Sequence, residues 1–376
     1  MTFTRASTAW CSKTGEASSI SNGDLVECAN NQPRVMPGGD GSGGNGLGVW
    51  SARTNTLLRS AELENAAWSS ISSGAAAPTV TANFATAPDG TTTAERLQFP
   101  ATTLGQYSGW RQVSSCPIGL SSGGLYLKLN SGGPLTTNVC LGDATDFDCT
   151  ADTTINSSTW TRVYRNNGPL DIVGGLYFGN ISPSGTTSTT FGFAAQPAMD
   201  ALAWGAHCES GVNLGPYITT VASAATRVAE VAYFATVPPF PVASIAATAT
   251  TATGWVPTAG AFNALVDSDD NASKYFLAAA KAGVGTGCTT NSDTGVADSF
   301  VASALASGGR VACAVSGSGG TTTGFLNSVA ASSASTGTLT TAHTQISIGG
   351  FARGTAHWLN GTAKNVCLDP NSTRCR

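Results

Sequence analysis

Residues 215–232, GPYITTVASAATRVAEVA, decide how the chain divides, because they begin as an apolar strand and continue as small residues. On both sides, short apolar runs are separated by Gly, Pro, Asp and Ser. Several runs alternate apolar and polar residues, which is the pattern of strands with one buried face. Long helical periodicity is absent, and residues 60–68 predict at most a short helix. We therefore predict an all-β chain of two tandem jelly-roll or β-sandwich domains that meet near residues 225–235.

The first 55 residues predict an extended N-terminal arm. Residues 33–48, PRVMPGGDGSGGNGLG, hold too many prolines and glycines for a regular element over most of their length. We expect the arm over residues 1–55, a first jelly roll similar to a carbohydrate-binding module over 56–228, and a second over 229–376.

Composition indicates a soluble chain with real cores. Of the 376 residues, 41% are hydrophobic and 11% are charged, and the formal net charge is −4. Scattered Lys and Arg give no basic surface for nucleic acid. No apolar run reaches the roughly 18–20 residues that span a bilayer. The N-terminus also lacks the apolar core of a secretion signal, so we expect neither membrane insertion nor signal-directed export.

Ten cysteines favour disulfides over a metal site. None forms a Cys-x-x-Cys pair, and the three histidines lie far apart, so zinc is not expected. An even count suits disulfides formed outside a reducing cytosol. Buried free thiols are the alternative. The expected pairs are four local couples and the two cysteines that remain: Cys11–Cys28, Cys140–Cys149, Cys288–Cys313, Cys367–Cys375 and Cys116–Cys208.

Two short motifs suggest chemistry that their surroundings oppose. GLSSG (119–123) matches the nucleophile-elbow pattern around Ser121, and Asp171 or Asp200 and then His207 follow in hydrolase order. The elbow must lead into a helix, whereas the strand pattern LYLKL follows at once. Residues 41–46, GSGGNG, match a dinucleotide fingerprint but lack its strand and helix. We therefore expect no enzymatic activity and no cofactor.

Acidic residues also predict no catalytic pair. The chain has seven Glu and none after Glu230, so the second domain lacks Glu altogether. The densest acidic segment, GDATDFDCTAD (142–152), makes Asp143, Asp146 and Asp148 weak candidates for Ca²⁺. A solvated turn held by Cys140–Cys149 is the better interpretation.

Tryptophans are spread through the strand-like runs. A Trp on a strand is most often a core residue whose N–H needs a partner. An exposed one on a concave sheet could instead stack on a sugar ring, so binding of a host-surface glycan stays open. The residues concerned are Trp110, Trp160, Trp204, Trp255 and Trp358.

The wider context of the opening stretch resembles a signature of structural proteins of tailed bacteriophages. In that signature, an aromatic-G-A-x-x-E-x-G turn precedes a Y-I-P-T-like strand and a T-R-x-A-D-like exit. The matching residues here are Trp204-Gly205-Ala206, Glu209, Gly211, Tyr217-Ile218-Thr219-Thr220 and Thr226-Arg227. Thr219 replaces the usual Pro, and Glu230 replaces the usual Asp.

The N-terminal region resembles the opening of the same family. FTRASTA (3–9) and NQPRV (31–35) precede GLGVWSARTNTLLRSAEL (46–63), in which Ser51 stands near the usual Glu or Gly. ENAAW (64–68) and APDGTTTAERL (87–97) complete a series that covers residues 2–230 almost continuously. Over residues 230–370, RVACAVSG, ISIGGF and HWLNGTAKNVCLDP more weakly resemble the late strands of concanavalin-like (laminin-G-like) jelly rolls.

The resemblance implies a virion structural protein of head-fibre, capsid-decoration or tail-fibre type, released by host lysis. It implies a place on the virion surface, other virion proteins as partners, and a homo-oligomer. It also makes residues 215–232 the closing strand of the first jelly roll, with Arg227 as an expected interdomain contact. A secreted glycan-binding module and a polysaccharide depolymerase are the alternatives.

Overall fold

The computed structural model confirms the all-β prediction. Every strand pair between its named strands is antiparallel, and its described residues contain no helix. Consequently, no helix in this described part is long and apolar enough to cross a membrane. The described residues are 2–5, 9–12, 19–22, 24–28, 30, 34–37, 45–142, 147–150, 153–181, 187–188, 191–192, 194–234, 244–250, 262–269, 275–281, 283–292, 295–305, 309–316, 321–331, 335–336, 345–348, 359 and 361–369.

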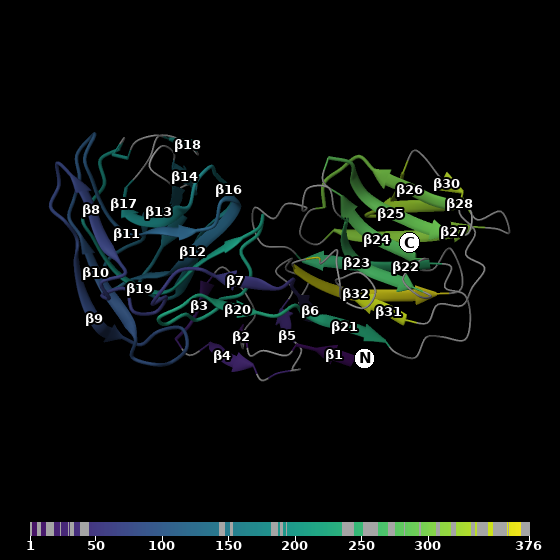
Figure 1. The fold of residues 1–376 in the computed structure, drawn as a ribbon, viewed down its shortest axis with the longest axis horizontal. Helices are drawn as coiled ribbons and strands as arrows, with labels where there is room; N and C mark the ends of the chain where they lie inside the picture. The colour runs from purple at the N-terminus through teal and green to yellow at the C-terminus, as the bar shows by residue number, and fades with distance from the viewer. Residues whose placement is uncertain are drawn as a thin grey trace. The chain divides into compact units, whose positions relative to one another are not determined.

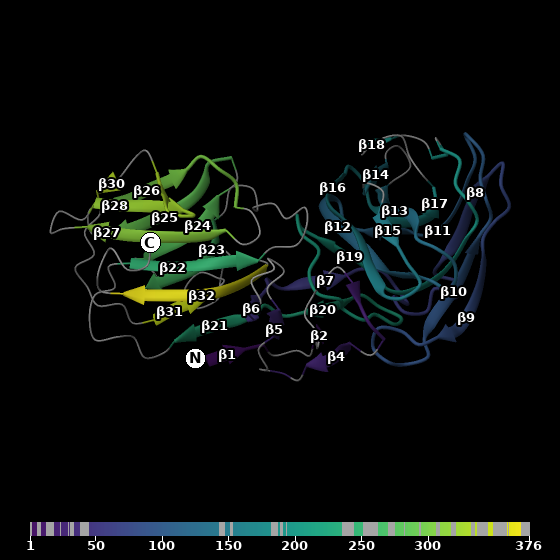
Figure 2. The ribbon, with the colours of Figure 1, turned by 180° about the vertical axis from the view of Figure 1, so that it is seen from behind.

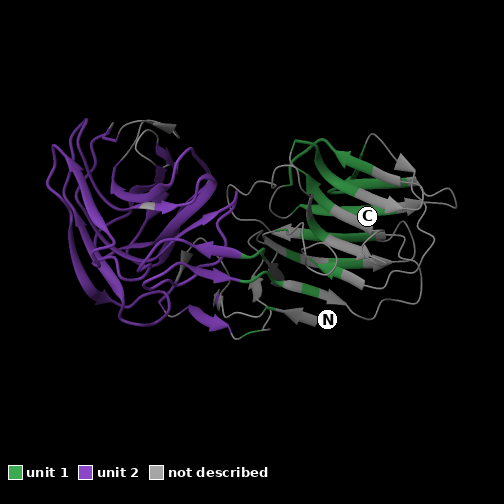
Figure 3. Cartoon of the chain, in the orientation of Figure 1, with its two compact units in different colours: residues 1–8, 29–52, 228–376 green, residues 9–28, 53–227 purple. Residues whose placement is uncertain are grey.

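The chain folds as two compact units, coloured separately in Figure 3. Unit 1 comprises residues 1–8, 29–52 and 228–376, and unit 2 comprises residues 9–28 and 53–227. The expected arm is therefore not a separate element that precedes two domains. Strands from residues 1–55 instead belong to both units. Each pairs with another strand of its unit, which satisfies its backbone hydrogen-bonding groups.

Unit 2 contains two large antiparallel sheets (Figure 1). The first has the order β3-β16-β12-β19-β10-β9, and the second has the order β18-β14-β13-β17-β11-β8, with β15 also paired to β13. The strands of the first sheet are β3 (Ser19–Ile20), β9 (Thr79–Ala85), β10 (Ala94–Phe99), β12 (Gly119–Leu129), β16 (Trp160–Leu170) and β19 (Met199–Ser210). Those of the second are β8 (Ser69–Ser73), β11 (Tyr107–Cys116), β13 (Leu135–Gly142), β14 (Phe147–Cys149), β15 (Thr153–Ile155), β17 (Gly174–Asn180) and β18 (Thr187–Ser188).

The core of unit 2 lies between these sheets. Leu125 and Leu127 of β12 share one buried cluster with Leu141 of β13 and Phe178 of β17. Alternate residues of a strand point to opposite faces, so these side chains come from the inner face of each sheet. Two facing sheets with a shared apolar core make unit 2 a β-sandwich.

A second aromatic layer covers the outer face of the first sheet. Trp160 and Trp204 pack there with Tyr126, Tyr217 and the half-buried Trp10. Trp10 belongs to a two-stranded sheet of β2 (Ala9–Ser12) and β4 (Leu25–Cys28). These tryptophans are core residues, as are Trp68 and Trp110; Trp255 and Trp358 lie outside the described residues.

Unit 1 also contains two large antiparallel sheets, which Figure 2 shows from behind. One has the order β1-β21-β31-β23-β24-β25-β26, and the other β29-β28-β27-β22-β32-β6-β5, with β30 paired to β28. The strands of the first sheet are β1 (Thr2–Thr4), β21 (Val231–Phe234), β23 (Phe262–Asp269), β24 (Tyr275–Lys281), β25 (Gly285–Ser292), β26 (Gly295–Val301) and β31 (Gln345–Ile348). Those of the second are β5 (Arg34–Pro37), β6 (Asn45–Val49), β22 (Ser244–Thr250), β27 (Arg310–Ser316), β28 (Thr321–Leu326), β29 (Val329–Ala330), β30 (Ser335–Thr336) and β32 (Gly361–Asp369).

TFTRASTA (2–9) and TRVAEVA (226–232) both contain a Thr-Arg pair followed by mostly small residues, but they occupy different elements. The first segment begins with β1, which pairs with β21 at the end of the second segment. Arg5 then forms a buried ion pair with Glu230, with 3.1 Å between Nη1 and Oε1. In unit 2, β20 (Ala225–Arg227) holds the Thr-Arg pair of the second segment and pairs with β7 (Arg53–Asn55). The two segments therefore have different strand partners and do not mark a repeated site.

Three of the five expected disulfides lie in the described part of the chain. Cys116–Cys208, Cys140–Cys149 and Cys288–Cys313 are bonded, with Cα–Cα distances of 5.6, 3.9 and 5.2 Å. Cys28 and Cys367 are disulfide-bonded as well. Their expected partners, the side chain of Cys11 and residue Cys375, lie outside the described structure.

The longest of these disulfides is expected to stabilise unit 2 most. Cys116 and Cys208 are 92 residues apart, whereas Cys140 and Cys149 are nine apart. Because a longer closed loop removes more entropy from the unfolded chain, Cys116→Ala/Cys208→Ala should cost about 2 kcal/mol more than Cys140→Ala/Cys149→Ala. Differential scanning calorimetry of the two double variants measures this difference. Equal losses would show that loop length does not govern the contribution.

Candidate functional site

The last residue of β7, Asn55, connects parts of unit 2 that are far apart in sequence. The Asn55 side chain is fully buried, and its Nδ2 donates to Ala206 O at 3.1 Å and to Ile218 O at 2.7 Å. Its Oδ1 accepts from the amides of Cys208 at 3.0 Å and Leu57 at 3.2 Å. Asn55 of the ARTN motif (52–55) is thus hydrogen-bonded to two later motifs, WGAHCES (204–210) and YITT (217–220).

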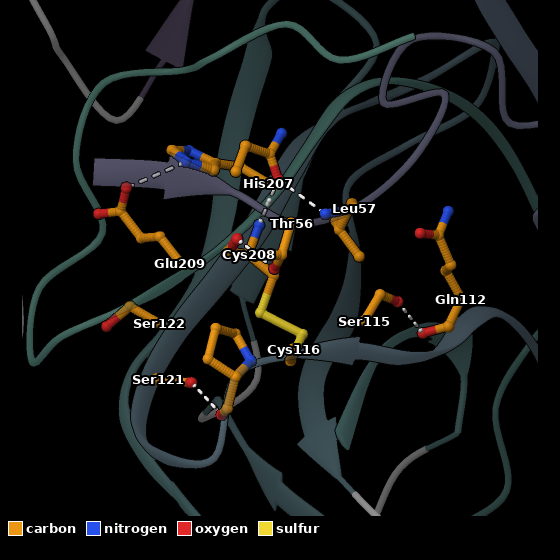
Figure 4. The surroundings of a disulfide bond; sticks show 12 residues. Thr56, Leu57, Gln112, Ser115, Cys116, Ser121, Ser122, His207, Cys208 and Glu209 are labelled. Atoms are coloured by element: carbon orange, nitrogen blue, oxygen red, sulfur yellow. Dashed lines mark hydrogen bonds and ion pairs between the residues drawn. A yellow bond between two sulfur atoms is a disulfide. The ribbon is translucent and has the colours of Figure 1, made fainter. Parts of the chain in front are cut away.

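A buried charged group lies beside this connection. His207 Nε2 is 3.1 Å from Glu209 Oε2 (Figure 4). Arg53 Nε is 3.6 Å from Glu209 Oε1. Burial lowers the pKa of His207, so the imidazole is neutral. Burial works against ionisation of Glu209, but His207, Arg53 and the Gly215 amide together lower its pKa. The Glu209 carboxylate is thereby kept ionised beside His207 on the outer face of the first sheet, opposite the core residues Ala206 and Cys208.

Arg227 belongs to this same buried region of unit 2. It is opposite Arg53 in the β7–β20 register, and its charge contributes to lowering the pKa of His207. It also lies against Gly215, where an added Cβ would be 3.4 Å from Nη2. The expected interdomain role of Arg227 stays a prediction.

A groove of about 490 Å³ opens next to the Cys116–Cys208 disulfide. Its walls are positioned by the Gln112 side chain, which accepts from Leu58 N at 2.7 Å and donates to Leu58 O at 2.8 Å. Figure 4 shows Gln112, Ser115 and Thr56 around the disulfide. The lining residues are Thr56, Leu58, Ala67, Gln112, Val113, Ser115, Cys116, Pro117 and Val173.

The polar groups of the groove are already engaged within the protein. Thr56 Oγ1 donates to Cys208 O at 3.0 Å, and Ser115 Oγ donates to Val113 O at 3.1 Å. None of the lining residues carries an acid, a base or a free thiol. A groove without titratable groups cannot perform general acid–base catalysis, but it can accept apolar side chains.

Beside the groove lies an aliphatic patch, which we define as Val113, Ile118, Leu120, Ile172 and Val173. Their exposed fractions are 46, 59, 41, 50 and 46%. Strand register brings them together, because Gly119 is opposite Leu170 and Cys116 is opposite Gly174. The turn that holds Ile118 therefore adjoins the turn that holds Ile172 and Val173.

The candidate hydrolase residues do not form a triad. Ser121 is inside β12, where its Oγ donates to Pro117 O at 2.7 Å, so no strand-to-helix elbow exists. In register, Ser121 is opposite Ser210 and His207 is opposite Gly124. Asp200 is held by Arg96 through two hydrogen bonds of 2.8 and 2.7 Å. Asp171 is in the exposed turn of the aliphatic patch.

The calcium candidates are only partly within the described structure. Asp143 and Asp146 lie outside it. Both oxygens of Asp148 accept from Arg165, at 2.9 and 2.8 Å. This carboxylate is therefore neutralised by a guanidinium. The described residues contain no group of three or more His, Cys, Asp or Glu side chains placed to hold a metal ion.

Glu95 is a buried carboxyl group that the sequence did not single out. Its Oε2 accepts from Asn83 N at 3.1 Å. Burial, together with the adjacent carboxyl group of Glu64 and the charge of Glu62, raises its pKa to about 8. Glu95 is therefore protonated at neutral pH.

This protonation should make stability depend on pH. The folded protein retains a proton that the unfolded chain releases near pH 4.5, so the contribution of Glu95 is complete below that pH and is lost as pH rises to about 8. At pH 8 we expect Glu95→Gln, which stays neutral, to be on the order of 2 kcal/mol more stable than the unmodified protein. Thermal melts from pH 5 to pH 8 measure the difference, with the exposed Glu27→Gln as control. Parallel curves for Glu95→Gln and the unmodified protein would refute this assignment.

Sequence reasoning missed the groove and the aliphatic patch. The available signal was the presence of Ile and Val in turns, in CPIGL (116–120) and LDIVGG (170–175), where polar residues are usual. No protein-family model matches the chain, and no curated protein matches it either. The functional interpretation therefore rests on the residues of this chain and their geometry.

Proposed function

We propose that this chain is a non-enzymatic structural protein of a bacteriophage virion surface, a capsid decoration or a short fibre or tail tip. The observation that carries the proposal is the groove without titratable groups beside five half-exposed aliphatic side chains. Such a surface suits binding to another protein subunit better than turnover of a substrate.

The positions of the family-like motifs support the same proposal. The ARTN, WGAHCES and YITT segments meet at Asn55 and Ser60, whose hydroxyl bonds to Tyr217 OH at 2.7 Å. These motif residues therefore join the segment at 55–60 to β19 and to residues 217–220. Buried, hydrogen-bonded motif residues are what we expect where a motif maintains a fold, as in a structural protein.

The disulfides support a location outside a reducing cytosol. Three bonded pairs in the described structure favour a protein that functions in an oxidising environment. Release of virions by host lysis would deliver the chain to such an environment.

Host-glycan binding receives less support. The described tryptophans are buried except for Trp10, which is half-buried and already donates its indole N–H to Thr219 Oγ1 at 2.7 Å. A stacking platform for a sugar needs an accessible ring face, so we do not include glycan binding in the proposal.

Gradient-purified phage particles test the proposal. Mass spectrometry should detect the chain in stoichiometric copies per particle after high-salt washing. Its absence from washed particles would refute virion membership. Release of reducing sugars from host polysaccharide by the purified protein would refute the non-enzymatic assignment.

A further inference from the structure

The aliphatic patch and the groove form one surface, which has projecting side chains and a groove that can accept side chains. Ile118 and Ile172 protrude from turns, whereas Val113 and Val173 belong both to the patch and to the groove wall. The five half-exposed aliphatic side chains expose roughly 400 Å², which is the size of the largest apolar patch on a typical monomer, and such patches are often functional. The adjoining groove enlarges the apolar surface that a partner can cover.

The charges at the margin of this surface are self-complementary. Arg111 lies two residues before Val113 on β11, next to the point where the register with β17 becomes irregular. Its guanidinium contacts the Tyr177 ring at 5.8 Å and has no ion-pair partner among the described residues. Asp171, next to Ile172, is exposed and likewise has no ion-pair partner in the described part. One cation and one anion thus flank a neutral centre.

We propose that this surface binds a second copy of the same chain across a two-fold axis. In a two-fold interface, each surface must complement itself, so that residue i contacts j and j contacts i. Here the protruding isoleucines of one copy enter the groove of the other, and Arg111 of each copy meets Asp171 of its partner. A foreign partner would require neither the groove beside the protrusions nor the balanced charges. The inference deepens the proposed function by naming how the virion subunit pairs.

Sedimentation-velocity ultracentrifugation of the full chain tests the proposal. The unmodified protein should sediment as a species with an even number of copies at about 10 µM. Ile118→Asp and Ile172→Asp should each raise the dissociation constant at least tenfold. The matched control is Leu104→Asp, because Leu104 is 77% exposed and outside the patch; it should leave the dissociation constant unchanged. Circular dichroism spectra that match that of the unmodified protein will show that the variants fold, because dissociation of a dimer can itself lower the melting temperature.

Charge reversal provides a second, more specific test. Arg111→Asp and Asp171→Arg should each weaken the dimer, and combining them should restore it, because the opposite charges again meet across the axis. A monomeric unmodified protein, or patch variants that associate normally, would overturn the two-fold surface. If the chain is monomeric yet present in washed virions, the two-fold surface is wrong while the proposed function stands. If the chain is a dimer but is absent from washed virions, the proposed function is wrong while the two-fold surface stands.

Discussion

Replacing Asn55 with alanine is expected to lower the free energy of unfolding of unit 2 by about 4 kcal/mol or more. The substitution removes all four hydrogen bonds of one fully buried amide. It leaves two backbone carbonyls and two backbone amides without partners in a site with no access to water. Each such group costs about 1–3 kcal/mol, so the combined loss exceeds that of an ordinary polar substitution.

Asn130→Ala is the matched control for this prediction. Asn130 is half-buried, and its side chain donates one hydrogen bond, to Asp200 Oδ2 at 3.0 Å. We expect its loss to cost about 1 kcal/mol. Urea denaturation gives both values, and hydrogen exchange will show whether the loss is confined to unit 2. Comparable costs for the two variants would mean that Asn55 does not have the structural role assigned to it.

Breaking the Arg5–Glu230 pair is expected to cost unit 1 about 3–5 kcal/mol, because the remaining charge is left buried. Both side chains are fully buried, and their charged atoms are 3.1 Å apart. Arg5→Met removes the cation and leaves the Glu230 carboxylate without it. Melting experiments on the full chain measure the loss, and hydrogen exchange in β1 and β21 should rise.

A double variant distinguishes the effect of an unpaired buried charge from the effect of a changed side-chain volume. Arg5→Met/Glu230→Leu removes both charges, so it should recover most of the stability lost in Arg5→Met. Lys281→Met provides the exposed comparison within unit 1, because the Lys281–Asp298 pair is 3.5 Å long and its side chains are 27 and 39% exposed. That change should cost under about 1 kcal/mol. If the double variant is no more stable than Arg5→Met, the buried charge is not the cause of the loss.

The strands were the most predictable part of this protein. WTRVYR, LYLKL and GLYFGN lie in β16, β12 and β17, because strong alternation or apolar content is a local property of the sequence. Even Cys116–Cys208 could be anticipated by elimination once the nearer cysteines were paired. The jelly-roll connection pattern itself stays a prediction.

Long-range pairing could not be predicted in the same way. Residues 2–4 pair with 231–233 and residues 47–49 with 361–363, so segments of the expected arm become strands within unit 1. Nothing local in these residues specifies their partners. Likewise, Asn55 is an ordinary turn or strand residue in sequence, and its four partners lie up to 163 residues away.

The candidate site was unpredictable for a related reason. Whether Ile118 or Ile172 is exposed depends on which elements cover its turn, which is a tertiary property. Sequence patterns for catalysis pointed to Ser121 and His207, yet Ser121 bonds to the Pro117 carbonyl and His207 is buried beside Glu209. The surface that we propose to be functional carries no motif.

Cryo-electron microscopy of the intact particle tests the proposed virion role most directly. The account predicts density on the virion surface into which both units fit, with Ile118 and Ile172 buried against a second copy of the chain. Particles that lack this density, while the purified protein is produced in the same infection, would contradict the proposed function.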